Sequence, residues 1–183
     1  MFYRKRGYVI LDCNATSVDL QAIIFALEFS SVLCITVSGT ERVPLDNAYC
    51  QVLRTTSLIG RFDVPVIKQG RGAHRAGHQI AKICEQFPHK VTIICLGPLT
   101  NIADAINCSN TFHKKVKRIL FAAGGFSGRQ FTCHHNIEVS LCRKCNCKPI
   151  SLSSNFSVDN SSVTFSLIQR RVVQYLDHLF LSS

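Results

Sequence analysis

The sequence predicts an α/β protein with a mainly parallel sheet and helices on both of its faces. Three observations support this fold class. Short apolar runs, typical of buried strands, alternate with segments whose apolar residues recur at helical spacing. Short turns join the two kinds of segment, as in parallel sheets covered by helices. The length of 183 residues suits one domain with a sizeable core.

The expected elements follow in a regular order. Strands are predicted at short runs of apolar and β-branched residues, over 7–12, 31–37, 64–67, 91–96 and 116–122. Helices are predicted where apolar residues recur at helical spacing, over 18–27, 45–59, 79–87 and 98–106. Gly60 and Pro88 end two of these helices, and Pro98 opens the last one.

A parallel sheet of this kind binds ligands beyond the carboxyl ends of its strands. The candidate site therefore consists of the segments that follow the predicted strands, Asp12–Asp19, Ser38–Thr40, Leu96–Asn101 and Ala122–Gly125. These segments contain carboxylate, hydroxyl and amide side chains, which suit polar chemistry at the edge of a sheet.

The composition changes after residue 137. Residues 142–147 are rich in Cys, and residues 151–162 are rich in Ser and Asn, as in a loop or linker. Residues 163–181 return to helical spacing. We therefore expect an α/β domain over 1–137 and a divergent Cys- and Ser-rich segment with a C-terminal helix over 138–183.

The chain has 21 Lys and Arg against 11 Asp and Glu, a net charge of +10. Such an excess can mark a nucleic-acid binder, but here the basic residues form short, scattered groups without interleaved aromatic residues. Solvated surface charge is the favoured interpretation, and nucleic acid is not expected as a partner. No apolar run reaches the length of a membrane helix or of a signal-peptide core, which predicts a soluble, cytoplasmic protein without a membrane partner.

Ten Cys residues are present, and without a secretory signal a disulfide framework is not expected. Cys142 and Cys145 have the spacing of zinc ligands, with Cys133, His134 and His135 nearby. A second well-spaced pair is missing, so the sequence does not favour zinc, and a basic interaction module that binds nucleic acid or zinc is kept only as an alternative.

Residues 11–19, Leu-Asp-Cys-Asn-Ala-Thr-Ser-Val-Asp, resemble the aspartate-rich signature Leu-Asp-x-Asp-Pro-Gly-x-Asp-Asp of nucleoside hydrolases. Further segments similar to that family follow in the same order, among them Gly60–Val66, Gly124–Gly125 and Asn136–Ile137. The most specific is the intact Leu-Gly-Pro-Leu-Thr-Asn-Ile-Ala of residues 96–103. The resemblance covers roughly residues 7 to 137.

The resemblance implies a Rossmann-like core and calcium-assisted hydrolysis of the N-glycosidic bond of ribonucleosides to ribose and free base. A calcium ion at the strand tips would hold the ribose hydroxyls and a water, and a metal-bound carboxylate would act as general base on that water. The resemblance implies a ribonucleoside as the small-molecule partner and allows a homo-oligomer.

For metal binding, the resemblance implies Asp19, Asn14 and the backbone carbonyl of Leu96, with Asp12 behind them. Asn14 stands where the family has the aspartate that is also the general base. An amide oxygen can bind an ion, but an amide does not take a proton at neutral pH. Val18 replaces a ribose-binding aspartate and offers no hydrogen bond.

For substrate binding, the resemblance implies three positions. Thr40 stands at a ribose-binding Asn of the second strand, and His134 at a Glu that binds the primary hydroxyl of the sugar. Asn136 keeps the partner of that Glu. The family's last metal aspartate and its neighbouring catalytic His have no equivalent here, so we expect the fold to be incomplete at its C-terminal side.

These departures predict weak calcium binding and weak or lost hydrolysis. The alternative within the family is a non-catalytic relative that acts in nucleoside binding or in oligomer modulation.

Overall fold

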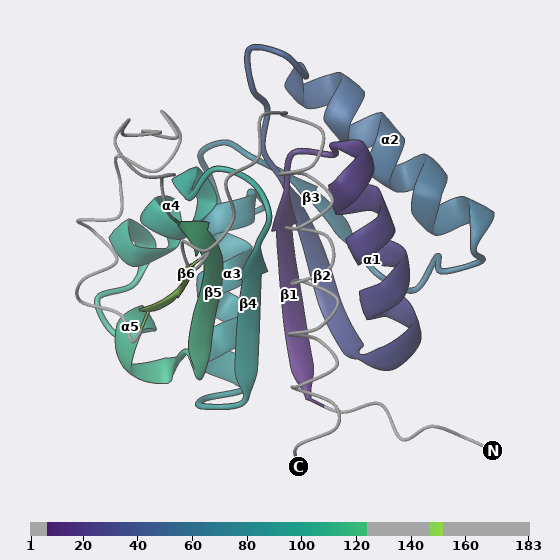
Figure 1. Ribbon diagram of the computed structural model, residues 1–183. Coiled ribbons are helices and arrows are strands. Elements are labelled where there is room, and N and C mark those ends of the chain that lie inside the picture. The colour runs from purple at the N-terminus through teal and green to yellow at the C-terminus, as the bar shows by residue number, and fades with distance from the viewer. Residues whose placement is uncertain (1–6, 124–146, 152–183) are drawn as a thin grey trace, which may run out of the picture.

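The computed structural model describes residues 7–123 and 147–151 (Figure 1). Its sheet has six strands in the order β3-β2-β1-β4-β5-β6, and every neighbouring pair is parallel. The strands are β1 (Tyr8–Cys13), β2 (Ser31–Val37), β3 (Val66–Lys68), β4 (Val91–Cys95), β5 (Arg118–Ala123) and β6 (Cys147–Ser151).

Helices cover both faces of this sheet (Figure 1). The helices are α1 (Ser17–Phe29), α2 (Leu45–Leu58), α3 (Ala76–Gln86), α4 (Thr100–Cys108) and α5 (Phe112–Lys115). The core residues of α1 and α2 form one buried cluster with the sheet, and those of α3, α4 and α5 form another. The predicted fold class, a parallel sheet with helices on both faces, is confirmed.

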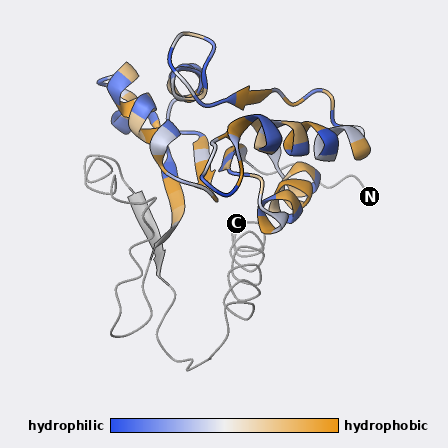
Figure 2. Cartoon of the chain, turned by 90° about the horizontal axis from the view of Figure 1, so that it is seen from above, coloured by the Kyte–Doolittle hydropathy of each residue, from blue (hydrophilic) through white to orange (hydrophobic). Residues whose placement is uncertain are grey.

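The alternation of side chains along a strand accounts for the two clusters. In β1, Val9 and Leu11 belong to the cluster under α1 and α2, and Ile10 belongs to the cluster under α3 and α4. Because both faces are buried, the central strands are continuous apolar runs, which Figure 2 shows as mostly hydrophobic segments between helices of mixed hydropathy. This packing fixes the position of β1 and therefore of the residues that follow it.

Two described elements differ from the expectation. Residues 112–115 form the short helix α5, and residues 147–151 form strand β6, between the Cys-rich and the Ser/Asn-rich segments, where the sequence predicted no strand. β6 is an edge strand that pairs with β5, and it contains Pro149, which cannot donate a backbone hydrogen bond. A proline in a short polar segment carries no strand signal, which explains why the strand was missed.

Helix α3 begins at Ala76, earlier than the predicted start at residue 79. The sequence did not indicate this first turn, because it contains Gly77 and has no capping side chain. The predicted helix over 163–181, together with Cys142, Cys145, His134 and Asn136, lies outside the described residues. Within the described part of the chain, no helix is long and apolar enough to cross a membrane.

Candidate functional site

The candidate site lies where β1 and β4 end. The chain continues from β1 outward to β2 and β3 on one side, and from β4 outward to β5 and β6 on the other. The connections after these two strands therefore diverge, and the space beyond their carboxyl ends is the usual ligand position in a sheet of this order.

The tips of β1 and β4 approach each other closely. The backbone N–H of Leu96 donates to the carbonyl of Asp12 over 2.7 Å. A Cβ on Gly97 would lie 3.0 Å from the backbone carbonyl carbon of Cys13, so this tight contact favours glycine. The structure thus brings the residues after β1 against Leu96 and Gly97 from the intact central motif.

Asp12 is a fully buried carboxylate at the end of β1. Its Oδ1 accepts hydrogen bonds from Thr36 Oγ1 at 2.6 Å and from Asn101 Nδ2 at 2.8 Å. Its Oδ2 is buried and has no hydrogen-bond partner among the described residues. Burial raises the pKa of Asp12 to about 7, against the two hydrogen bonds, which lower it, and the negative charge of Asp19 also raises it.

Asn101, at the start of α4, connects Asp12 to the end of β2. Its Nδ2 also donates to Ser38 Oγ at 2.9 Å, and Ser38 Oγ lies 3.4 Å from Thr100 Oγ1. The sequence placed Ser38 and Asn101 within candidate segments but assigned them no role, and it did not single out Thr36. Their signal was position alone: a hydroxyl at a strand end and an amide in the intact motif.

Asp19 holds the loop between β1 and α1. Its Oδ2 accepts from the backbone N–H groups of Asn14 and Thr16, both at 3.1 Å, and Thr16 Oγ1 accepts from the N–H of Asp19 at 3.3 Å. This is a capping box at the start of α1. Ala15 has a positive φ of 59°, so the loop is tightly bent. Burial raises the pKa of Asp19, while these hydrogen bonds lower it.

Asn14 lies half-buried on this bent loop, and its buried Oδ1 has no hydrogen-bond partner within residues 7–123 and 147–151. Thr40 lies on the loop after β2, where its Oγ1 accepts from the N–H of Val43 at 3.0 Å. The structure therefore places Asp12, Asn14 and Asp19 around the end of β1, and Thr40 on the neighbouring connection. His134 and Asn136 lie outside the described residues.

The site contains oxygen atoms that lack a partner. Asp12 Oδ2, Asn14 Oδ1 and Asn101 Oδ1 are all buried and accept no hydrogen bond from the part of the chain that the structure describes. Buried acceptors of this kind are satisfied by a hydrogen-bond donor or a cation, and carboxylate, amide and carbonyl oxygens are the ligands of calcium. Among the described residues, however, no three His, Cys, Asp or Glu side chains gather into a metal-binding group. The site fits calcium in the kind of its ligands and offers it little charge.

Comparison with known families agrees with this geometry. The family model described as inosine-uridine preferring nucleoside hydrolase matches residues 9–167. The chain belongs to this family. The match extends past residue 137, where the recognisable motifs ended, and includes β6.

Two known nucleoside hydrolases illustrate the relationship. Uridine nucleosidase 1 of Arabidopsis thaliana is 35% identical over 68 residues, which are 37% of this chain and 20% of the relative. The pyrimidine-specific ribonucleoside hydrolase RihA of Citrobacter koseri is 30% identical over 149 residues, covering 63% of this chain and 47% of the relative. The chain spans less than half the length of either protein.

Solved structures of nucleoside hydrolases share the fold. The plant nucleoside hydrolase PpNRh1 aligns with a TM-score of 0.59 and 26% identity, over 66% of this chain and 48% of that chain. The purine-preferring ribonucleoside hydrolase from Gardnerella vaginalis aligns with a TM-score of 0.59 and 18% identity, over 66% of this chain and 49% of that chain. At 18% identity, the similarity to the Gardnerella vaginalis protein shows the fold alone.

Proposed function

We propose that this nucleoside hydrolase relative binds the ribose of a ribonucleoside beyond the ends of β1 and β4, and that its hydrolysis of the N-glycosidic bond is weak or lost. The observation that supports the proposal is a buried polar network beside an altered base position. Asp12 makes buried contacts to Thr36 and Asn101, while Asn14, where the family has its general base, carries an amide oxygen without a partner among the described residues.

In this proposal Asn14, Asp19 and the carbonyl of Leu96 hold a calcium ion. When bound, the ion would orient the ribose hydroxyls and make a nearby water more acidic. Asp19 supplies charge and also shapes the loop, because its Oδ2 accepts from the N–H groups of Asn14 and Thr16. Asp12 lies behind these three ligands and is fully buried. It fixes the Asn101 side chain through a hydrogen bond and keeps negative charge close to the loop.

The weakness lies in proton transfer. A carboxylate can accept the proton of an attacking water, whereas the Asn14 amide does not at neutral pH. Val18, half-buried in the first turn of α1, offers no hydrogen bond to a ribose hydroxyl. Ground-state binding through oxygen ligands is retained more readily than catalysis, because only catalysis needs the base.

Restoring the carboxylate tests this proposal. We expect Asn14→Asp to raise calcium-dependent ribose release from uridine and inosine at least about tenfold over the unaltered chain, because a general base contributes about 10² to 10⁴ in rate. Asn110→Asp, on the exposed turn before α5, adds the same charge away from the site and should leave the rate unchanged. Release is measured with excess calcium and with a chelator, on protein shown to be folded by circular dichroism.

Two results would contradict the proposal. One is ribose release by the unaltered chain that Asn14→Asp does not increase, which would place the base elsewhere. The other is a folded chain that does not bind uridine or inosine in titration calorimetry with calcium present, which would remove the nucleoside as ligand. Binding without release in both forms would support the non-catalytic relative.

A further inference from the structure

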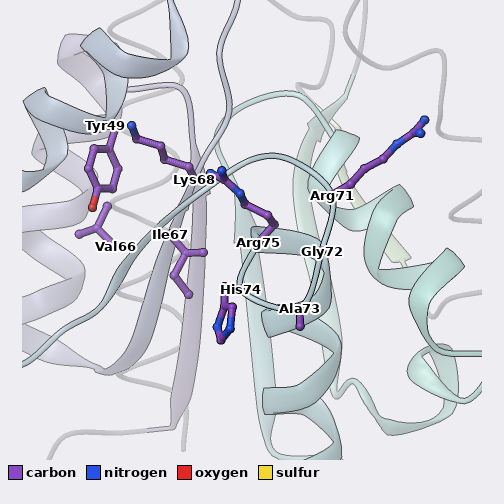
Figure 3. A pocket seen from close by; sticks show the side chains of 9 residues that line it. All are labelled: Tyr49, Val66, Ile67, Lys68, Arg71, Gly72, Ala73, His74 and Arg75. Carbon is purple, nitrogen blue, oxygen red and sulfur yellow. The ribbon is translucent and has the colours of Figure 1, made fainter.

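A pocket lies away from the candidate site, between the end strand β3, α2 and the loop that leads to α3 (Figure 3). It has a volume of about 490 Å³, and its polar lining comes from Tyr49, Lys68, Arg71, His74 and Arg75. β3 is separated from β1 by β2, so the pocket is about 10 Å from the end of β1 at a strand spacing of about 4.8 Å. None of the residues around Asp12 lines it.

The charge of this pocket is positive. Its lining contains Lys68, Arg71 and Arg75 and no carboxylate. Asp46 pairs with Lys68 at 2.6 Å from outside the lining, but its side chain is 82% exposed, so solvent screens the pair. Lys68 Nζ also lies 4.5 Å from the centre of the Tyr49 ring, which holds the ammonium group in place.

The loop after β3 is shaped to carry these cations. Gly70 and Gly72 have φ values of 140° and 105°, which side chains rarely adopt. A Cβ on Gly70 would lie 3.3 Å from Cδ of Arg75, so the bare glycine lets the Arg75 side chain lie across the loop. Figure 3 shows Arg75 and Lys68 extending toward the same side of the loop, while Arg71 extends the other way.

The start of α3 adds to the positive potential. Arg75 is its N-cap and makes no side-chain capping hydrogen bond, and no acidic residue lies in the first turn. The N–H groups of that turn point toward the loop with the positive end of the helix dipole. Glycines at positive φ, adjacent arginines and an uncapped helix start together favour an anion with several acceptor oxygens.

We propose that this pocket binds the phosphate monoester of a small organic molecule. Lys68 and Arg75 contact the phosphate oxygens, and the exposed Arg71 side chain can swing in because it makes no ion pair within the described residues. Phosphate alone leaves much of about 490 Å³ empty, and Tyr49, Val66 and Ile67 supply an apolar wall for the organic part. The proposal does not depend on nucleoside binding at β1.

The competing explanation is general attraction of anions to a chain of net charge +10. That explanation predicts that removing any two surface cations weakens the binding of an anion equally. The paired variants Arg71→Ala/Arg75→Ala and Arg54→Ala/Lys82→Ala remove the same charge, the first from the pocket and the second from exposed positions on α2 and α3. Neither pair contributes to the core, so both variants should fold.

The test is titration calorimetry of the full chain with ribose 5-phosphate, inorganic phosphate and ribose at about 0.15 M salt, where exposed charges are largely screened. We expect saturable binding of ribose 5-phosphate, tighter than that of inorganic phosphate. The pocket variant should weaken it at least about tenfold and the control variant less than about twofold, because charged hydrogen bonds at fixed positions outweigh screened surface charge. Gly70→Ala, which strains the loop at a φ of 140° and crowds Arg75, should also weaken it.

Several outcomes would overturn the proposal. Equal weakening in both paired variants would make the attraction non-specific. Ribose that binds as tightly as ribose 5-phosphate would place the ligand at the sugar site of β1 instead. A short single-stranded RNA that binds more tightly than ribose 5-phosphate and is lost in the pocket variant would replace the small molecule by a nucleic acid.

Discussion

Asp12 combines complete burial with a negative charge that has few partners. Only Oδ1 accepts hydrogen bonds within the described residues, and Oδ2 has no partner. Desolvation therefore outweighs the hydrogen bonds from Thr36 and Asn101, and the pKa rises to about 7. A buried carboxylate with few partners lowers the stability of the folded chain at neutral pH. Carboxylates with such raised pKa values cluster at functional sites.

This gives a pH dependence. The pKa of Asp12 is higher in the folded chain, about 7, than the ordinary value of 3.8, so the folded state binds the proton more tightly. The resulting stabilisation is complete below pH 3.8 and is lost as the pH rises through about 7, by about 4 kcal/mol in all. In Asp12→Asn this loss should be absent. Denaturant unfolding of both forms at pH 5 and pH 8 measures the part of this loss that falls above pH 5, about 3 kcal/mol.

The difference between the two forms at the two pH values isolates Asp12, because the other groups titrate in both. Asn keeps an oxygen for the Thr36 and Asn101 donors, so the comparison is nearly isosteric. If Asp12→Asn and the unaltered chain lose the same stability between pH 5 and pH 8, Asp12 is ionised throughout and its Oδ2 has found a partner.

Asn101 is the second residue whose replacement should be costly. In Asn101→Ala, Asp12 loses one of its two donors and Ser38 loses its contact with the amide. We expect a destabilisation of about 2–3 kcal/mol, as for other buried hydrogen bonds to charged groups, and a further rise in the pKa of Asp12. Asn110→Ala, at an exposed turn, should change stability by less than about 0.5 kcal/mol. Similar values for the two variants in urea unfolding would show that the network contributes little.

At the scale of the elements, the close packing of α3 against α4 depends on Gly77. A Cβ there would overlap the Cβ of Asp104 and lie 3.0 Å from the backbone N of Ala105. Glycine inside a helix ordinarily costs about 1 kcal/mol relative to alanine. Here the contact between the helices requires it, so the local preference and the packing oppose each other.

Gly77→Ala should therefore destabilise the chain by about 1–3 kcal/mol, the range for overpacking, although it improves helix propensity. Ser57→Ala, at an exposed position in α2, serves as the control for propensity and should be neutral or slightly stabilising. Thermal unfolding of the two variants decides between the effects. A higher melting temperature for Gly77→Ala would mean that α3 and α4 can move apart at little cost.

The same elements show what the sequence could predict. β2 has the predicted bounds because Ser31–Val37 is rich in β-branched residues between clear turns. The sequence did not predict β6, because Pro149 disfavours a strand and is tolerated only at the edge of the sheet. It also did not predict the first turn of α3, because Gly77 disfavours a helix and is needed for the close contact with α4. At the site, Asp12, Asn14 and Asp19 followed from one motif. The contacts of Thr36, Ser38 and Asn101 depend on how three strand ends meet, which no local pattern encodes.

At the scale of the whole molecule, two sites of opposite charge lie along one edge of the sheet. The end of β1 carries Asp12 and Asp19, and the pocket beside β3 carries Lys68, Arg71 and Arg75. The net charge of +10 favours the second and opposes a divalent cation at the first. The affinity of any calcium site here is therefore lowered by two effects, the small number of carboxylates and the positive net charge of the chain.

This weakness can be measured through stability. A ligand that binds only the folded state stabilises it by RT ln(1 + [L]/Kd), and a calcium site with few carboxylates has a Kd on the order of 1 mM. About 10 mM calcium should then add about 1.4 kcal/mol, a rise in melting temperature of about 3–6 °C. Sodium chloride of equal ionic strength controls for screening, and Asn14→Ala removes one ligand. An equal rise in Asn14→Ala would place the ion elsewhere, whereas a rise confined to the unaltered chain and enlarged in Asn14→Asp would locate it at the end of β1.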